Sequence, residues 1–61
     1  MKNSNYTLVF EHLDGTDTYL ETDNYASAWN TFVYYGNQLS LFGLFRIHFI
    51  DSVCEEVVTA S

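Results

Sequence analysis

The middle of the chain carries the clearest pattern of apolar positions. From Asp23 to Gly36, apolar residues recur every three or four positions, which places them along one side of a helix. Thr22, Asp23 and Asn24 each carry an oxygen that can accept a hydrogen bond from a free N–H of the first turn, and Gly36 is expected to end the helix in the left-handed conformation. The apolar side consists of Tyr25, Ala28, Trp29, Phe32 and Tyr35.

A β-hairpin is predicted before this helix, after a short polar lead from Met1 to Asn5. Tyr6 to Leu13 is rich in β-branched and aromatic residues, Asp14-Gly15 is typical of a turn, and a second strand follows from Asp17 to Thr22. The register of this hairpin decides which side chains share a face.

Two registers are possible. A two-residue Asp14-Gly15 turn would set Leu8 opposite Glu21 and mix apolar and charged side chains on one face. A three-residue loop with Gly15 in the left-handed position sets Leu8 opposite Leu20 and Phe10 opposite Thr18, and we favour it. The face opposite to the core then carries Glu11, Asp17, Tyr19 and Glu21.

The favoured register makes Glu11 and Asp17 direct cross-strand neighbours. Like charges in such positions are destabilising, by some tenths of a kcal/mol. Arg46 or His48 on a neighbouring strand would relieve the repulsion, and so would a basic partner protein. The neighbouring strand is the simpler of the two explanations.

The segment from Asn37 to Gly43 is unusually apolar for a connection, since it contains Leu39, Leu41 and Phe42. We expect either a short helical turn packed under the sheet or an exposed contact patch. Leu44 to Asp51 then alternates as a strand does. On one face it places Phe45, Ile47 and Phe49, and on the other Arg46 and His48.

A fourth, weaker strand is expected from Cys54 to Thr59, with Glu55 and Val57 on one face and Glu56 and Val58 on the other. The chain can turn at Asp51-Ser52, but no glycine or proline marks that turn, so one bent strand is the alternative.

These elements predict an α+β fold over a single domain, residues 1–61: a small three- or four-stranded sheet (β-β-α-β-β) with one helix packed on one face. The helix aromatics are expected to meet Leu8, Phe10, Leu20, Ile47 and Phe49. The opposite face is expected to stay open and to carry Val9, Tyr19, the hairpin acids, Arg46 and His48.

Charge narrows the possible partners. Eight carboxylates against Lys2 and Arg46 give a net charge of −6, which disfavours direct binding to nucleic acid. No basic leader and no long apolar run is present, so we expect a cytoplasmic protein without a signal peptide or membrane span. Aromatic residues make up 18% of so short a chain, more than its interior can hide, which predicts exposed aromatic surface and favours a homodimer.

No catalytic or cofactor motif is present, so we expect no enzyme activity and no cofactor. His12, His48 and Cys54 lack the spacing of a zinc site, and no metal is expected. The three glycines are far apart and form no phosphate-binding loop. Glu55 and Glu56 point to opposite faces of a strand and cannot act as a catalytic pair.

Five of the eight acids fall in the hairpin and at the start of the helix. They are too few to imitate duplex DNA, whose phosphates follow each other every ~1.7 Å, but enough to occupy a basic groove of a partner protein. The predicted partner-binding residues are Glu11, Asp14, Asp17, Tyr19, Glu21, Asp23, Leu41 and Phe42. The alternative is a homo-oligomeric structural module with no separate target.

The order of these elements resembles that of small acidic inhibitor and host-takeover proteins encoded by bacteriophages, and the layout is similar to the podophage inhibitor of host RNA polymerase. The resemblance rests on size, element order and acidity over Tyr6 to Phe49. The segments that carry it are the hairpin (Tyr6 to Thr22), the helix start Thr22-Asp23-Asn24-Tyr25-Ala26-Ser27-Ala28-Trp29, and the strand segment Phe45-Arg46-Ile47-His48-Phe49. It implies a protein of the host cytoplasm that inhibits or modulates a host protein by binding. The scarcity of basic residues and the apolar connection from Leu39 to Leu44 depart from that inhibitor.

Overall fold

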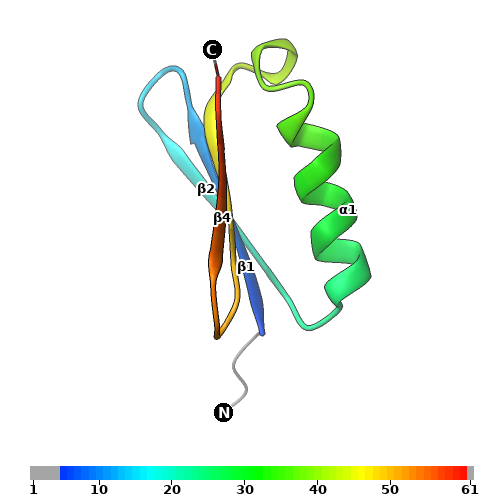
Figure 1. The fold of residues 1–61 in the computed structure, drawn as a ribbon. Coiled ribbons are helices and arrows are strands. Elements are labelled where there is room, and N and C mark those ends of the chain that lie inside the picture. The colour runs from blue at the N-terminus through cyan, green and yellow to red at the C-terminus, as the bar shows by residue number, and fades with distance from the viewer. Residues whose placement is uncertain (1–4, 61) are drawn as a thin grey trace.

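In the computed structural model, residues 5–60 form a four-stranded antiparallel sheet with one long helix packed on one face (Figure 1). The elements are β1 (Tyr6–His12), β2 (Asp17–Thr22), α1 (Tyr25–Gly36), a 3₁₀ helix (Ser40–Phe42), β3 (Leu44–Ile50) and β4 (Glu55–Thr59). The strand order is β2-β1-β3-β4. The expected α+β fold is therefore confirmed, with the fourth strand present. Apart from Asn5, the predicted polar lead lies outside the described residues.

The hairpin adopts the register that separates apolar from charged side chains. Leu8 lies opposite Leu20, and Glu11 lies opposite Asp17. Gly15 has a φ of 94°, the left-handed conformation that the three-residue loop requires. The N–H of His12 donates to the carbonyl oxygen of Thr16 at 2.8 Å and closes the loop.

Helix α1 begins as predicted and also ends at Gly36 as predicted, but the conformation at that end differs. The side chain of Asn24 accepts a hydrogen bond from the N–H of Ser27 at 2.9 Å, which caps the first turn. The prediction that Gly36 ends the helix in the left-handed conformation is wrong, because Asn37 follows in a right-handed conformation and Gln38 donates to the carbonyl of Tyr35. Gly36 instead lies where the helix comes close to the sheet: a Cβ there would be 3.7 Å from Cγ2 of Val58.

The core lies between α1 and the sheet, and Phe49 is at its aromatic centre. The ring centroid of Phe49 is 5.2 Å from that of Trp29 and 5.7 Å from that of Phe32. Leu39, which precedes the 3₁₀ helix, is also buried, so the connection after α1 forms the expected helical turn, although the residues of the turn itself, Ser40–Phe42, are not buried. The buried core residues are Leu8, Phe10, Ala28, Phe32, Leu39, Leu44, Ile47 and Phe49.

Leu20, a predicted core residue, and Phe45, which was expected on the same strand face as Ile47 and Phe49, are not buried. Leu20 faces the helix side of β2, but its side chain is 42% exposed, because α1 packs mainly on β1 and β3. Phe45 is 39% exposed because the β1–β3 register shifts at Glu11/His12 and makes Phe45 an extra, bulged residue. Leu44 takes the buried position in its place.

The turn between β3 and β4 is made by Asp51. Its carboxylate accepts the N–H groups of Val53 and Cys54, both at 2.7 Å. The alternative of one bent strand is therefore excluded, and β4 pairs with β3 along its length. Val58 packs against the core from this strand.

Candidate functional site

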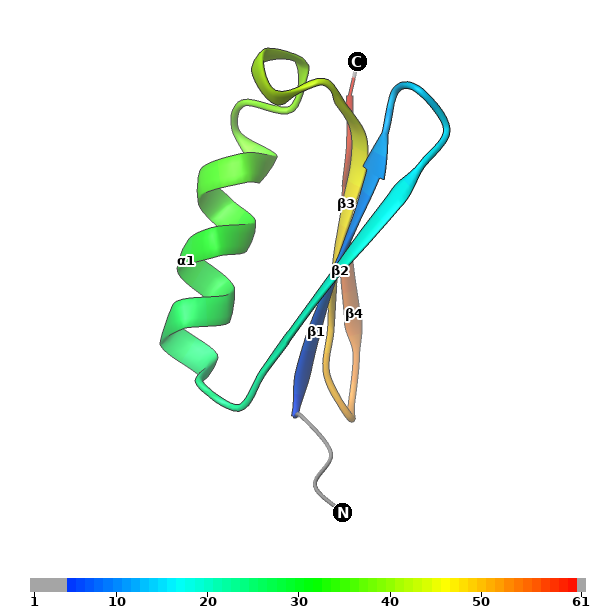
Figure 2. The same cartoon turned by 180° about the vertical axis from the view of Figure 1, so that it is seen from behind.

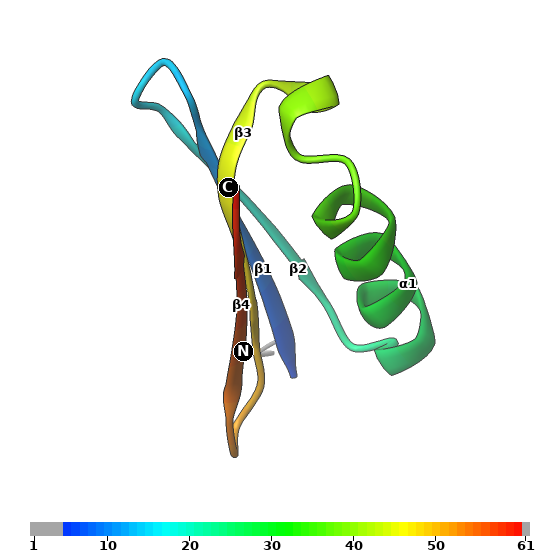
Figure 3. The same ribbon diagram turned by 45° about the horizontal axis from the view of Figure 1, so that its top comes forward.

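One face of the sheet is not covered by any described element. Figure 3 shows α1 on the other side only. We call the uncovered side the open face, and the register places on it a lattice of twelve side chains. These are Thr7, Val9 and Glu11 of β1, Asp17, Tyr19 and Glu21 of β2, Arg46, His48 and Ile50 of β3, and Glu55, Val57 and Thr59 of β4. The open face therefore carries most of the polar side chains that were predicted to lie on the face opposite to the core.

An ion cluster, formed by Glu11, Arg46, His48 and Glu55, joins three strands across this face. The Glu11 carboxylate lies 2.5 Å from Nε2 of His48 and 3.4 Å from Nη1 of Arg46. Nδ1 of His48 lies 2.8 Å from the carboxylate of Glu55. Each ring nitrogen thus faces a carboxylate oxygen, an arrangement that both nitrogens can satisfy as donors only in the protonated imidazolium. The guanidinium of Arg46 also lies over the ring of the bulged Phe45, at 4.7 Å.

The cluster shifts the pKa values of its members. Burial alone would lower the pKa of His48, but the hydrogen bonds and charges of Glu11 and Glu55 outweigh burial and raise that pKa above its ordinary value. The hydrogen bond from His48 lowers the pKa of Glu11, and the charge of Arg46 lowers it further. The repulsion expected between Glu11 and Asp17 is therefore relieved within the chain, by both candidate residues on β3.

The other two acids of the open face are not compensated in this way. We call Asp17, Tyr19 and Glu21 of β2 the acidic edge. All three side chains are exposed, Tyr19 by 64%. Among residues 5–60, neither Asp17 nor Glu21 forms an ion pair or a side-chain hydrogen bond.

The remaining predicted residues lie elsewhere. Asp14 is part of the hairpin loop, where the hydroxyl and N–H of Thr16 bind its carboxylate and lower its pKa. Asp23 accepts the N–H of Asn5 at 3.0 Å. Leu41 and Phe42 lie in the 3₁₀ helix, in the layer of α1 rather than on the open face. The structure therefore brings Glu11, Asp17, Tyr19 and Glu21 onto one face and leaves the others apart from them.

Tyr34 is an exposed aromatic residue that the sequence did not single out. Its side chain is 55% exposed, and its ring centroid lies 5.8 Å from that of Phe42. Together with Leu41, which is 71% exposed, these residues form an apolar surface that we call the aromatic corner. The contact between Tyr34 and Phe42 forms because the 3₁₀ turn folds back beside the end of α1. The spacing of apolar residues within the helix does not by itself predict that contact.

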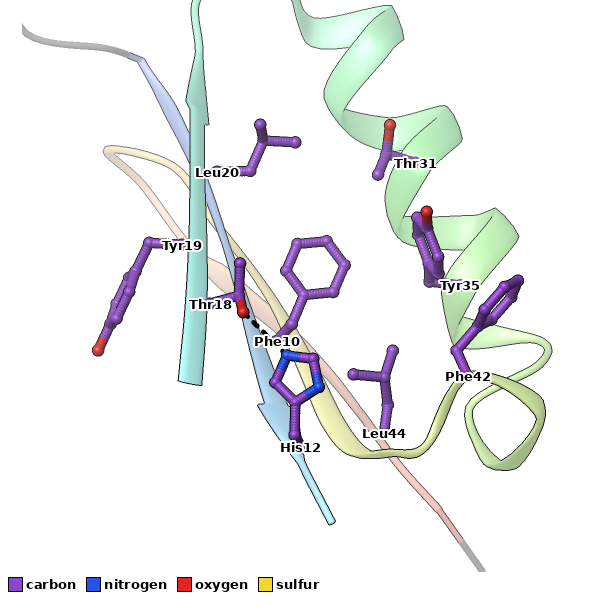
Figure 4. Close-up of a pocket in the computed structure, with 9 residues that line it drawn as sticks. All are labelled: Phe10, His12, Thr18, Tyr19, Leu20, Thr31, Tyr35, Phe42 and Leu44. Carbon is purple, nitrogen blue, oxygen red and sulfur yellow. Dashed lines mark hydrogen bonds between the residues drawn. The ribbon is translucent and has the colours of Figure 1, made fainter. Parts of the chain in front are cut away.

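A groove between β2 and the second half of α1 was also not predicted. Its volume is about 500 Å³. Figure 4 shows Leu20 and Thr18 on the groove side of β2 and Tyr19 pointing away from it. Nε2 of His12 lies 2.9 Å from the hydroxyl of Thr18 at one end of the groove. The residues that line it are Phe10, His12, Thr18, Tyr19, Leu20, Thr31, Tyr35, Phe42 and Leu44.

The described residues offer neither a metal site nor a reactive thiol. Residues 5–60 contain no group of three or more His, Cys, Asp or Glu side chains placed to hold a metal ion. The negative charge of Asp51 raises the pKa of the Cys54 thiol, and burial and Glu56 add to this shift, so the reactive thiolate is disfavoured. No helix in the described part of the chain is long and apolar enough to cross a membrane.

Comparisons with known proteins assign this chain to no family. Searches against protein-family models, curated proteins and solved structures gave no match.

Proposed function

We propose that the chain is a non-enzymatic binding protein whose acidic edge engages a basic surface of a partner protein and thereby inhibits or modulates that partner. The observation that carries this proposal is the contrast between the two sets of acids on the open face. Glu11 and Glu55 already have cationic partners in the ion cluster, whereas Asp17 and Glu21 have none among the described residues.

The composition of the acidic edge supports the same role. An exposed tyrosine lies between two acids, and tyrosine supplies a large contact area at low entropic cost. A lysine or arginine of the partner would be attracted to the carboxylates of Asp17 and Glu21. Binding would break no existing ion pair, because these carboxylates have none among the described residues. The resemblance to phage-encoded inhibitors makes a host protein in the bacterial cytoplasm the partner that we propose.

The test uses two substitutions that change the net charge equally. Glu21 and Glu56 are both exposed glutamates on edge strands, but Glu56 lies on β4 opposite Phe49 and outside the acidic edge. Tagged protein is used for capture from a bacterial lysate at low and high salt. We expect a stoichiometric partner that is lost at high salt and with Glu21→Lys but is retained with Glu56→Lys. Equal capture by the two variants would contradict the proposal.

The aromatic corner supports a second candidate function, a homodimer with no separate target. Tyr34, Leu41 and Phe42 are all exposed, and the rings of Tyr34 and Phe42 lie 5.8 Å apart. Such a patch can bury itself against a second copy. The mass of the purified protein in solution decides this alternative. A dimer that Phe42→Ser converts to a monomer would support it, while a monomer at every concentration tested would exclude it.

A further inference from the structure

Within residues 5–60, no strand pairs with the outer edge of β2. β2 is the last strand on its side of the sheet, and Figure 2 looks onto that edge. The bonded pair His12/Thr16 fixes the alternation of the antiparallel ladder. Thr18 and Leu20 therefore direct their N–H and C=O groups toward β1, whereas those of Asp17, Tyr19 and Glu21 point outward.

A strand added at this edge would lie beside the groove. Neighbouring strands are separated by about 4.8 Å, so side chains of the added strand that point toward α1 would lie next to Thr18 and Leu20. Leu20, which lines the groove, is apolar and 42% exposed, and Thr31 and Tyr35 of α1 form the opposite wall (Figure 4). Apolar side chains would complete this incompletely covered part of the core.

Side chains of the added strand that point the other way would meet the acidic edge. Asp17 and Glu21 are four residues apart, which corresponds to about 13 Å along a strand. Basic side chains four residues apart on the added strand would therefore face both acids, with one side chain between them beside Tyr19.

A second copy of the chain is a poor occupant of this edge. The self-pairing that uses the largest part of β2 is antiparallel and centred on Tyr19, and it sets Asp17 of each copy opposite Glu21 of the other. Two pairs of like charges would then face each other directly, which is destabilising. The charges thus disfavour self-pairing and favour a basic strand.

We infer that β2 binds an extended segment of the partner as a fifth strand, in which apolar residues alternate with polar ones and lysine or arginine occurs four residues apart. This inference rests on the proposed function and specifies how the acidic edge acts. Main-chain hydrogen bonds supply the pairing, while the groove and the two acids select the sequence.

The probe is the peptide Thr-Val-Lys-Val-Thr-Val-Lys-Val-Thr, acetylated, amidated and fluorescently labelled, with binding followed by anisotropy. Two derivatives carry backbone N-methyl groups, one on the central threonine and one on the two valines that flank it. Strand addition uses only one edge of the peptide, so we expect one derivative to lose at least about tenfold in affinity and the other to change by less than about threefold. The derivative that loses affinity reports whether the added strand is antiparallel or parallel.

Protein variants test binding at the acidic edge separately from the addition of a fifth strand. We expect Glu21→Lys to weaken binding about tenfold and Glu56→Lys to leave it within about twofold. Replacement of the peptide's valines by serine should weaken its binding to both protein variants.

If peptide binding depends on Glu21 but both N-methylated peptides bind as well as the parent peptide, strand addition is wrong. Binding by the acidic edge is then still supported. Equal binding by Glu21→Lys and Glu56→Lys, or no binding up to about 1 mM peptide, would overturn both.

Discussion

Phe45 and Phe49 provide a matched pair of substitutions on one strand. Simple alternation places them on the same face of β3, whereas the structure buries Phe49 and leaves Phe45 39% exposed. We predict that Phe49→Ala destabilises the fold by about 3–5 kcal/mol, the usual cost of removing a buried phenylalanine. Phe45→Ala should cost about 1 kcal/mol, mainly from partial burial and the contact with Arg46.

The difference is large on the scale of this chain. A chain of 61 residues is expected to have a free energy of unfolding of about 3–9 kcal/mol, so Phe49→Ala removes a large part of it. For domains of this size, 1 kcal/mol corresponds to a change in Tm of roughly 4–8 °C. We therefore expect Tm to fall by at least about 12 °C for Phe49→Ala and by less than about 8 °C for Phe45→Ala.

Thermal unfolding of both variants and the wild type can be followed by the fluorescence of Trp29, the one tryptophan of the chain, with circular dichroism as a second probe. The ring of Trp29 is 5.2 Å from that of Phe49, so dichroism controls for a direct effect of the substitution on fluorescence. Equal losses of Tm in the two variants would refute the bulge and restore the uninterrupted alternation.

Three further substitutions test separate parts of the fold. Gly36→Ala should raise the free energy of unfolding in urea by about 0.5–1 kcal/mol, because the added methyl group makes only ordinary contacts and favours the helix; a loss of stability would show that the helix cannot accept it. Asn24→Ala should lower the same free energy by about 0.5–2 kcal/mol through loss of the cap, and no change would mean that the cap contributes nothing. Because the folded pKa of His48 is raised, its contribution to stability is complete below the unfolded pKa of about 6.5 and is lost as pH rises through the folded pKa. The urea midpoint should therefore fall from pH 6 to about pH 9, less so in His48→Gln, and parallel pH profiles of the two proteins would contradict the role of the ion cluster.

The elements and the hairpin register could be predicted because local patterns determine them. Leu8 opposite Leu20 is the register that keeps charge out of the core, and Gly15 makes the matching loop possible. Gly36 was misassigned because a glycine near a helix end fits both a left-handed cap and a close approach to the sheet, and only the position of Val58 distinguishes them. A turn at Asp51-Ser52 was one of two alternatives, and the side chain of Asp51 favours it, since an aspartate often begins a turn by accepting N–H groups two and three residues later.

The groove could not be predicted from local patterns, because it depends on where the helix crosses the sheet. Four strands span about 14 Å between the outer axes, whereas a helix is about 10 Å wide. One helix therefore cannot cover both edge strands, and Leu20 on β2 stays partly exposed. The numbers of helices and strands predict how much of the sheet stays uncovered, but they do not predict which edge strand is left uncovered.

The most direct test of binding at β2 is amide hydrogen exchange with and without the peptide, resolved by residue with NMR. In the free protein, the amides of Asp17, Tyr19 and Glu21 point outward and should exchange quickly, while those of Thr18 and Leu20 are protected by pairing with β1. If the peptide adds as a fifth strand, we expect it to slow exchange at amides of the outward set, with Tyr19 among them. Unchanged exchange at Asp17, Tyr19 and Glu21 in a protein saturated with peptide would contradict it.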